Sequence, residues 1–112
     1  MRVLVAIHHP DDYQPASAED DSVRADINAV NDAMVAAGVR VFVGGLHPAR
    51  EARSLRLAGD GEVAVAEGPY LATSEHVGGF WVLDVADWDE ALSWGRRAAL
   101  ACRAPVEVRQ FH

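Results

Sequence analysis

The stretch GFWVLDVADWDEALSW, residues 79–94, decides the fold because it places a strand directly before a helix. Side chains of a strand alternate between its two faces. In the strand predicted over residues 79–85, one face carries Trp81, Leu83 and Val85, and the other carries Phe80, Val82 and Asp84. Most of these side chains are apolar, so this strand belongs in the interior of a sheet.

The residues after this strand are typical of a helix start. Asp87 fits the N-cap, where its carboxylate accepts from the third helical amide while Glu90 reaches back to complete a capping box. One face of the helix is then expected to carry the residues that recur at helical spacing, namely Trp88, Ala91, Leu92, Gly95 and Ala99.

The first third of the chain repeats the strand-then-helix order. RVLVAIH, residues 2–8, predicts an inner strand that ends before Pro10, because proline cannot donate to a sheet. A polar loop is expected over residues 10–21. The firmest prediction is a helix over residues 20–37, with Gly38 in a left-handed conformation after it. Its apolar stripe is Val23, Ile27, Val30, Met34 and Ala37.

Between these halves the sequence predicts a strand over residues 39–43, a hairpin of residues 54–57 and 62–65, and a loop over 68–76. A last strand is expected over residues 105–109. The order βα-β-hairpin-β-αβ predicts a single α+β domain spanning residues 1–112. We expect a mainly antiparallel sheet with both helices packed on one of its faces.

A sheet covered on one face leaves the other face bare. The residues expected there include Phe42, Phe80, Val82 and Phe111, which are too apolar to remain in water as one patch. We therefore expect a second copy of the same sheet to cover them, giving a two-fold homodimer with a pocket between the sheets.

Composition excludes several function classes. Seventeen acidic residues face ten basic ones, for a formal net charge of -7, which disfavours a nucleic-acid surface. All ten basic residues are arginine, so Schiff-base and P-loop lysine chemistry is excluded. The single Cys102 allows no internal disulfide and favours a reducing, cytoplasmic location. No apolar run reaches the roughly 18 residues of a membrane span.

No motif for a cofactor or a metal is present. The acidic residues between Asp11 and Asp32 lack the spacing of a calcium loop, and His8 and His9 point to opposite faces of a strand, which makes a poor zinc chelate. We expect neither a metal nor a cofactor.

Four motifs follow one another in the second half of the chain: EGPY at 67–70, EHVGGF at 75–80, DWDEALSW at 87–94 and VEVR at 106–109. With AMVAAGVRVFVGGL at 33–46, their order resembles the YCII-related family, in particular its DGPF-type branch. The resemblance implies a ferredoxin-like α+β fold that assembles as a dimeric α/β barrel. It differs from the usual pattern at Glu67, Tyr70, His47 and Gln110, where the branch commonly has Asp, Phe, Gln and Pro.

The resemblance implies little about activity. Most DGPF-type members have no assigned activity, and some lie beside or are fused to alternative sigma factors. A related YCII-type member is a dehydrochlorinase, and the wider group includes lactone isomerases. The histidine of the His–Asp pair discussed for YCII-type proteins falls early in the first helix, where this chain has Ile27 and no histidine. That role is therefore not carried over.

Two residues are candidates for acid–base chemistry. His47 follows Gly44-Gly45 and precedes Pro48, a rigid position from which an imidazole that titrates near neutrality can face a cavity. Asp84 is the one charge in its strand and is the candidate to orient His47 across the dimer. The structural alternatives are an exposed loop histidine, and an aspartate at a strand end that faces water or Arg109.

Four further residues are candidate ligand contacts: Glu67, Tyr70, Phe80 and Arg109. Each also has a structural alternative. Glu67 fits a residue that holds its Gly-Pro turn through backbone hydrogen bonds, Tyr70 a residue that covers the core, and Arg109 a partner of Glu107 or Asp84.

Three functions remain open. The first is a small homodimer that binds a small organic ligand between its sheets. The second is a cofactor-independent lyase or isomerase that uses His47 as acid and base. The third is a non-catalytic interaction module linked to transcriptional regulation. The sequence leaves open whether the protein is an enzyme.

Overall fold

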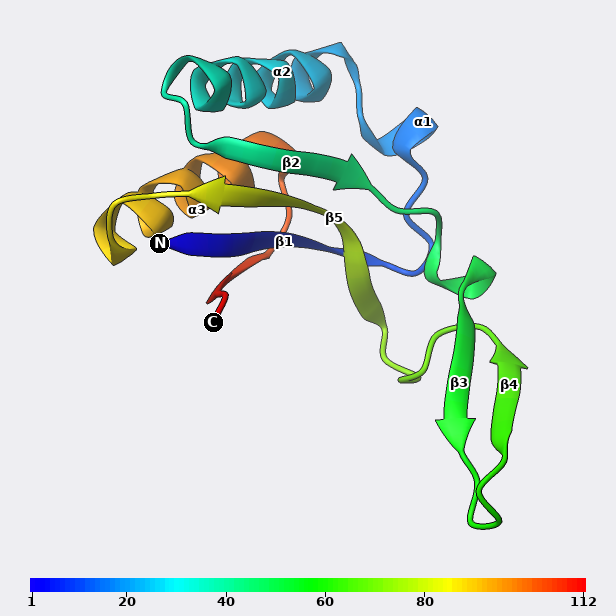
Figure 1. The fold of residues 1–112 in the computed structure, drawn as a ribbon. Coiled ribbons are helices and arrows are strands. Elements are labelled where there is room, and N and C mark those ends of the chain that lie inside the picture. The colour runs from blue at the N-terminus through cyan, green and yellow to red at the C-terminus, as the bar shows by residue number, and fades with distance from the viewer.

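A computed structural model describes residues 1–112. It contains one four-stranded sheet with two long helices on one face, and a two-stranded hairpin that projects from this layer (Figure 1). The elements are β1 (Arg2–Pro10), α1 (Pro15–Ala18), α2 (Asp21–Ala36), β2 (Arg40–Gly45), η1 (Ala49–Glu51), β3 (Arg53–Leu57), β4 (Val63–Glu67), β5 (Glu75–Asp84), α3 (Trp88–Cys102) and β6 (Val106–Gln110).

The strands of the main sheet lie in the order β2-β5-β1-β6, and every neighbouring pair is antiparallel. Helix α2 connects β1 to β2, and α3 connects β5 to β6. This is the topology of a ferredoxin-like α+β fold, with β3 and β4 inserted between the second and third strands of the sheet. The predicted fold class is confirmed.

Helix α2 matches its prediction closely. The Asp20 carboxylate accepts from the Val23 amide at 2.9 Å and caps the helix. The stripe side chains Val23, Val30 and Met34 are buried. Gly38 follows the helix with φ of +70°, a left-handed conformation that glycine adopts without strain.

The packed face of helix α3 agrees with the expected one only in part: Ala91 and Gly95 are buried as predicted. Trp88 and Leu92 are 42% and 49% exposed, so their assignment to the packed face was wrong. The buried residues are Ala91, Trp94, Gly95, Ala98 and Ala101. This stripe has the same spacing as the predicted one and is rotated around the helix. Gly95 belongs to both stripes, and at this position α3 lies so close to β6 that a Cβ would crowd Val108.

The predicted capping box is half present. The Asp87 carboxylate accepts from the Glu90 amide at 2.9 Å, as expected, but no return bond from the Glu90 side chain is formed. One carboxylate is therefore enough to begin α3 at Trp88.

Trp81 lies at the centre of the core and is only 2% exposed. Its indole Nε1 donates to Asn31 Oδ1 at 2.9 Å, and the same oxygen accepts from Arg40 at 3.1 Å. Asn31 therefore links α2 to β5 and β2, and it satisfies the one polar atom that the large indole carries into the core.

The central strands are longer than predicted. β1 continues to Pro10 and β5 begins at Glu75, four residues before the expected start at Gly79. Pro10 is tolerated because it stands at the strand end, where it needs no amide for the ladder and its carbonyl accepts from Tyr13. The short turns α1 and η1 were also not predicted, since three or four residues show no helical periodicity.

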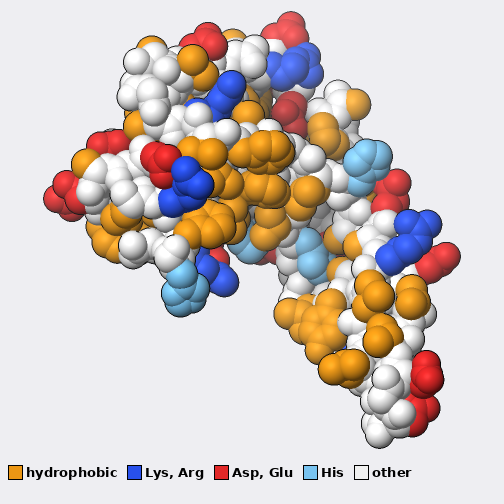
Figure 2. Space-filling model, in the orientation of Figure 1, with side chains coloured by type: hydrophobic (Ala, Val, Ile, Leu, Met, Phe, Trp, Pro, Cys, Tyr) orange, Lys and Arg blue, Asp and Glu red, His pale blue; other side chains and the backbone are white.

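The face of the sheet opposite the helices is uncovered, as predicted. Its centre is apolar, and it also carries the exposed ion pairs Arg2–Asp84 and Arg109–Glu107. Phe42 and Phe80 lie on it with ring centroids 5.8 Å apart, and Phe42 and Phe111 are 55% and 45% exposed. Val82 pairs with Phe42 in the ladder and shares this face. Figure 2 shows hydrophobic side chains gathered over the sheet. We call this surface the bare face.

The predicted hairpin is confirmed with slightly longer strands, and we call residues 53–67 the arm. Its base is closed by the Gly68 amide, which donates to the Ala52 carbonyl at 2.7 Å, and by the Ser54 hydroxyl, which donates to the Gly68 carbonyl at 2.6 Å. Gly61 forms the tip with φ of +85°. In Figure 1 the arm extends away from the sheet and the helices.

None of the helices combines the length and the apolar composition that crossing a lipid bilayer requires.

The two tryptophans of α3 provide a matched test of its packing. Replacing Trp94 by alanine is expected to lower the free energy of unfolding by about 3–5 kcal/mol, because a large buried ring is lost. Trp88→Ala is expected to cost less than about 1 kcal/mol, because that ring is largely exposed. Urea unfolding followed by circular dichroism measures both, and equal losses for the two variants would contradict this placement of α3.

Candidate functional site

Unequal strand lengths create an open end in the sheet. β6 pairs with β1 only between Val3 and Ile7, whereas β5 pairs with β1 as far as Pro10. The ladder between β1 and β5 also shifts after Ile7, so Gly78 has no partner across it. A Cβ at Gly78 would collide with the His9 ring. The bulge and its glycine therefore leave the space in which that imidazole lies.

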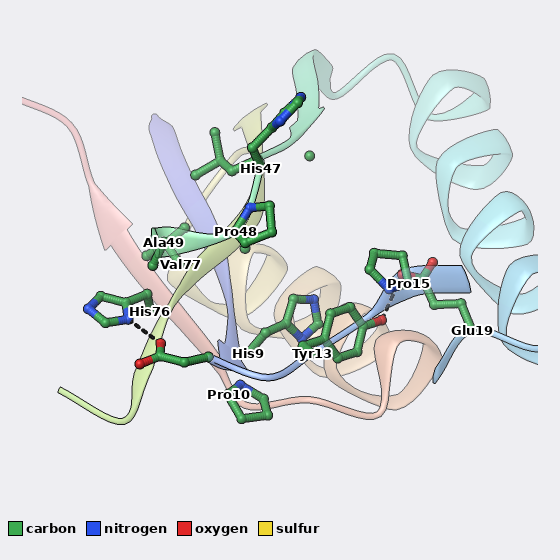
Figure 3. A pocket seen from close by; sticks show the side chains of 14 residues that line it. His9, Pro10, Tyr13, Pro15, Glu19, His47, Pro48, Ala49, His76 and Val77 are labelled. Carbon is green, nitrogen blue, oxygen red and sulfur yellow. Dashed lines mark hydrogen bonds and ion pairs between the residues drawn. The ribbon is translucent and has the colours of Figure 1, made fainter. Parts of the chain in front are cut away.

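The His9 ring stacks flat on Tyr13, with centroids 3.7 Å apart and planes 3° from parallel. The Tyr13 hydroxyl donates to Glu19 Oε2 at 2.6 Å. Pro10 and α1 bring the three residues together, because the chain leaves the sheet at Pro10 and folds back through the α1 turn (Figure 3).

Burial sets the protonation states of His9 and Tyr13. It lowers the pKa of His9 below its ordinary 6.5, and the attraction of the Glu19 carboxylate only partly opposes this effect. Burial and the hydrogen bond to Glu19 raise the pKa of Tyr13. At neutral pH His9 is therefore a neutral imidazole and Tyr13 a protonated phenol. The His9 ring nitrogens form no hydrogen bond within the chain.

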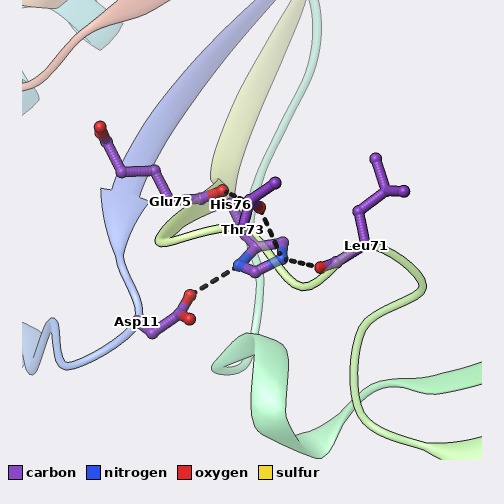
Figure 4. Close-up of polar contacts among 5 residues, drawn as sticks. All are labelled: Asp11, Leu71, Thr73, Glu75 and His76. Atoms are coloured by element: carbon purple, nitrogen blue, oxygen red, sulfur yellow. Dashed lines mark hydrogen bonds and ion pairs between the residues drawn. The ribbon is translucent and has the colours of Figure 1, made fainter.

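In contrast to His9, both ring nitrogens of His76 have hydrogen-bond partners within the chain. Its Nε2 lies 2.9 Å from the Leu71 carbonyl and its Nδ1 lies 2.6 Å from the Asp11 carboxylate (Figure 4). Two acceptors favour an imidazolium, which donates from both nitrogens. The carbonyl of Leu71 and then the carboxylate of Asp11 raise the pKa of His76. His76 therefore clamps the loop before β5 to the loop after β1.

These groups surround a pocket of about 320 Å³. His9, Tyr13 and Glu19 lie on one side, and Asp11 and His76 on another (Figure 3). A smaller space of about 160 Å³ lies behind the same His9–Tyr13 pair, toward α2 and the end of α3. The pocket is lined by residues of β1, α1, η1 and β5, at one end of the sheet.

His47 is the one predicted site residue that lines this pocket. Its side chain is 88% exposed, and its Nδ1 lies 3.5 Å from Glu51, too far for a strong hydrogen bond. Asp84 lies at the opposite end of β5, where it forms a two-pronged ion pair with Arg2 at 3.0 and 2.9 Å. Arg2 holds the pKa of Asp84 below its usual value. Within one chain His47 and Asp84 do not meet, so a pair between them requires a second chain.

The four predicted ligand contacts fall in two other places. Phe80 and Arg109 share the bare face, where Arg109 pairs with Glu107 at 2.6 Å. Phe80 also lines the smaller space beside His9 and Tyr13. Glu67 and Tyr70 lie at the base of the arm. The Glu67 carboxylate forms no hydrogen bond, and Tyr70 lies with its ring 4.7 Å from the Arg56 guanidinium and is 59% exposed. The structure does not gather the six predicted residues into one site.

His9, Tyr13 and Glu19 were not predicted as site residues. The available signal was a histidine at a strand end, before proline and a tyrosine, together with two glycines in a later strand. Only the register of β1 against β5 shows that Gly78 faces His9, and an open bulge of this kind cannot be derived from spacing alone.

The pocket suits proton transfer or hydrogen bonding to a small organic molecule. His9 offers one donor and one acceptor nitrogen, and the neighbouring ring faces provide apolar contact. No three of the histidine, cysteine, aspartate and glutamate side chains gather into a group that could hold a metal ion.

We predict that the pKa values of His76 and His9 are shifted in opposite directions. NMR titration of the ring signals is expected to give a pKa above 6.5 for His76 and below 6.5 for His9. Because the pKa of His76 is raised on folding, its contacts stabilise the fold fully below the ordinary pKa, and this contribution is lost as the pH rises through the raised pKa.

The stability difference between the chain and its His76→Gln variant should therefore be largest near about pH 6 and shrink toward about pH 9. Urea unfolding at several pH values measures it. A difference that grows with pH would contradict the clamp.

Comparison with known proteins places this site in a family context. The family model described as the YCII-related domain matches residues 1–111. An uncharacterized protein of Rhizobium meliloti (strain 1021) is 40% identical over 78 residues, which cover 70% of this chain and 62% of that relative. The chain thus spans less than two thirds of the relative's length. The match over nearly every residue shows that the chain belongs to the YCII-related family.

Proposed function

We propose that this protein binds a small organic ligand in the pocket beside His9, and that it is a homodimer of the DGPF-type branch. The observation that carries the ligand proposal is a half-buried, neutral imidazole whose ring nitrogens have no partner in the chain, at the wall of a pocket of about 320 Å³. Such a group in a largely preformed cavity is typical of a ligand site.

The pocket favours a compact ligand with one polar group near an apolar body. His9 and Tyr13 present stacked rings, and Pro10, Pro15 and Leu46 add further apolar surface. A volume of about 320 Å³ lies at the lower end of the range for small-molecule sites, roughly 300–1,000 Å³.

The proposed dimer covers the bare face with a second bare face. Phe42, Phe80 and Val82 form an apolar centre that a monomer would leave in water. Phe80 and Arg109 would then line the space between the two sheets. The DGPF-type assignment rests on the order of the EGPY, EHVGGF, DWDEALSW and VEVR motifs, and a reducing, cytoplasmic location on the single Cys102.

His9 also favours a second candidate, catalysis of proton transfer without a cofactor. A neutral imidazole can take a proton from a carbon next to a carbonyl and return it to another atom, which isomerises the substrate. If a leaving group departs with its electron pair instead, the same first step gives elimination. We assign to His9 the acid–base role that the sequence suggested for His47, because His9 is half-buried whereas His47 is exposed.

Ligand binding can be tested with two pocket variants and a matched control. His9→Gln removes the imidazole, and Gly78→Ala pushes the ring into the pocket. His8→Gln changes the neighbouring histidine, which does not line the pocket. We expect fluorinated fragments detected by ¹⁹F NMR to lose at least about tenfold in affinity for both pocket variants and to bind the control normally.

Fragments that bind all three variants equally, or that bind none of the folded proteins, would contradict the assignment of this pocket.

If the protein catalyses proton transfer, the substrate hydrogen next to the carbonyl is expected to exchange with solvent. Incubation of the protein with a panel of five-membered lactones in D₂O is expected to introduce deuterium next to the carbonyl, measured by mass spectrometry, and His9→Gln should abolish it. Exchange at the uncatalysed rate with every lactone would leave the protein a binder and remove the catalytic candidate.

A further inference from the structure

We propose that the arm is a dimerisation arm, whose apolar face packs against a second copy of this chain. The inference rests on the proposed homodimer and extends it. It assigns a role to residues 53–67, which neither the pocket nor the bare face uses.

The arm has one strongly apolar face. Leu55 pairs with Val65 and Leu57 with Val63, so the four aliphatic side chains project from the same side of the hairpin. All four are exposed, Leu55 at 64%, Val65 at 66%, Leu57 at 79% and Val63 at 50%. The opposite side carries Ser54, Arg56, Ala64 and Ala66. This alternation is that of a strand pair with one buried face, yet the chain itself does not bury it.

An isolated two-stranded hairpin is marginally stable in water, and packing on another surface is what usually orders it. β3 and β4 pack chiefly on each other and make little contact with the helices or the main sheet. The molecule is accordingly long and thin, with extents of 50 × 36 × 18 Å. The aliphatic side of the arm is therefore expected to pack on a surface outside this chain.

The placement of the arm favours a second copy as that surface. Figure 2 shows hydrophobic side chains of the arm and of the bare face exposed on the same side of the molecule. A copy seated on the bare face is therefore brought alongside the arm. Because a two-fold contact repeats every interaction, both arms are covered at once.

The size of the sheet gives an independent reason. The four strands have 9, 6, 10 and 5 residues. At about 4.8 Å between strands and about 3.4 Å per residue, the sheet covers on the order of 500 Å² in projection. A stable interface buries about 800 Å² on each partner. The bare face alone is small for a dimer interface. The arm adds apolar surface on the same side of the molecule as the bare face.

The two charged residues at the base of the arm also favour a contact with a second copy of this chain. Arg53 and Glu67 stand directly opposite each other in the ladder, on the side of the aliphatic residues. Neither forms an ion pair within the chain. A surface that presents one charge of each sign is complementary to its own two-fold copy, whereas a partner of one sign would leave a charge unmatched.

The test compares three variants of the full chain by sedimentation equilibrium. Leu57→Ser with Val63→Ser removes aliphatic groups from the apolar side of the arm. Ala64→Ser places the same hydroxyl on the opposite side and serves as the matched control. Val82→Arg charges the bare face. Circular dichroism checks that each variant is folded.

We expect the arm double variant to raise the dimer dissociation constant by about 30-fold or more, the effect of losing a central apolar anchor. The control should leave it within about threefold. Replacing residues 53–67 by a short turn between Ala52 and Gly68, whose backbones already bond, should have an effect at least as large.

The outcomes separate the arm from the rest of the proposal. A dimer that Val82→Arg dissociates but that the arm double variant and the arm deletion leave intact would overturn the arm's role and keep the bare-face dimer. A chain that stays monomeric at micromolar concentration would overturn both the arm and the dimer, while ligand binding beside His9 is measured separately. An arm captured by another protein while the chain is monomeric would equally overturn the proposal of a second copy.

Discussion

Both long helices pack on the same face of one four-stranded sheet, and the rest of the molecule follows from this one-sided arrangement. The chain order strand-helix-strand, used twice, brings α2 and α3 together over a core centred on Trp81. The hydrogen bond from Trp81 to Asn31 fixes α2 against β5 and satisfies the only polar atom of the indole. Nothing of the chain remains to cover the opposite face, so Phe42, Phe80 and Val82 are left at the surface.

The candidate site depends on a second consequence of the same topology. β1 and β5 are the two inner strands, and they extend beyond the end of β6. At that free end the ladder bulges at Gly78, the His9 ring takes the vacant space, and the following loop returns through Tyr13 to Glu19. Burial lowers the pKa of His9, whereas the hydrogen-bond acceptors around His76 raise the pKa of that ring. Two histidines from adjacent strands therefore take different roles, one available to a ligand and one structural.

The fold could be predicted from the sequence because its signals are local. The stripe from Val23 to Met34, the glycine after α2, the Asp87 cap and the glycines at the tip of the arm each specify their own element. The rotation of α3 could not be predicted, because the stripes through Trp88 and through Trp94 have the same period. Ala91 and Gly95 belong to both stripes, so the choice between them depends on how the helix packs on the assembled sheet, which no local pattern defines.

The candidate site was harder to predict for the same reason. His47 could be placed near a cavity from its glycine and proline neighbours, but nothing local distinguishes it from His9. Burial separates them, and burial depends on the register of two strands about 65 residues apart in sequence. Asp84 similarly gained a partner, Arg2, that faces it only through the β1–β5 ladder.

The central claim, that a second copy covers the bare face, is tested most directly by isotope-filtered NMR on a mixture of labelled and unlabelled chains. We expect intermolecular NOEs between the rings of Phe42 or Phe80 in one chain and aliphatic protons of the other. Intermolecular NOEs confined to the helices, or phenylalanine rings on the bare face that contact only water, would contradict it.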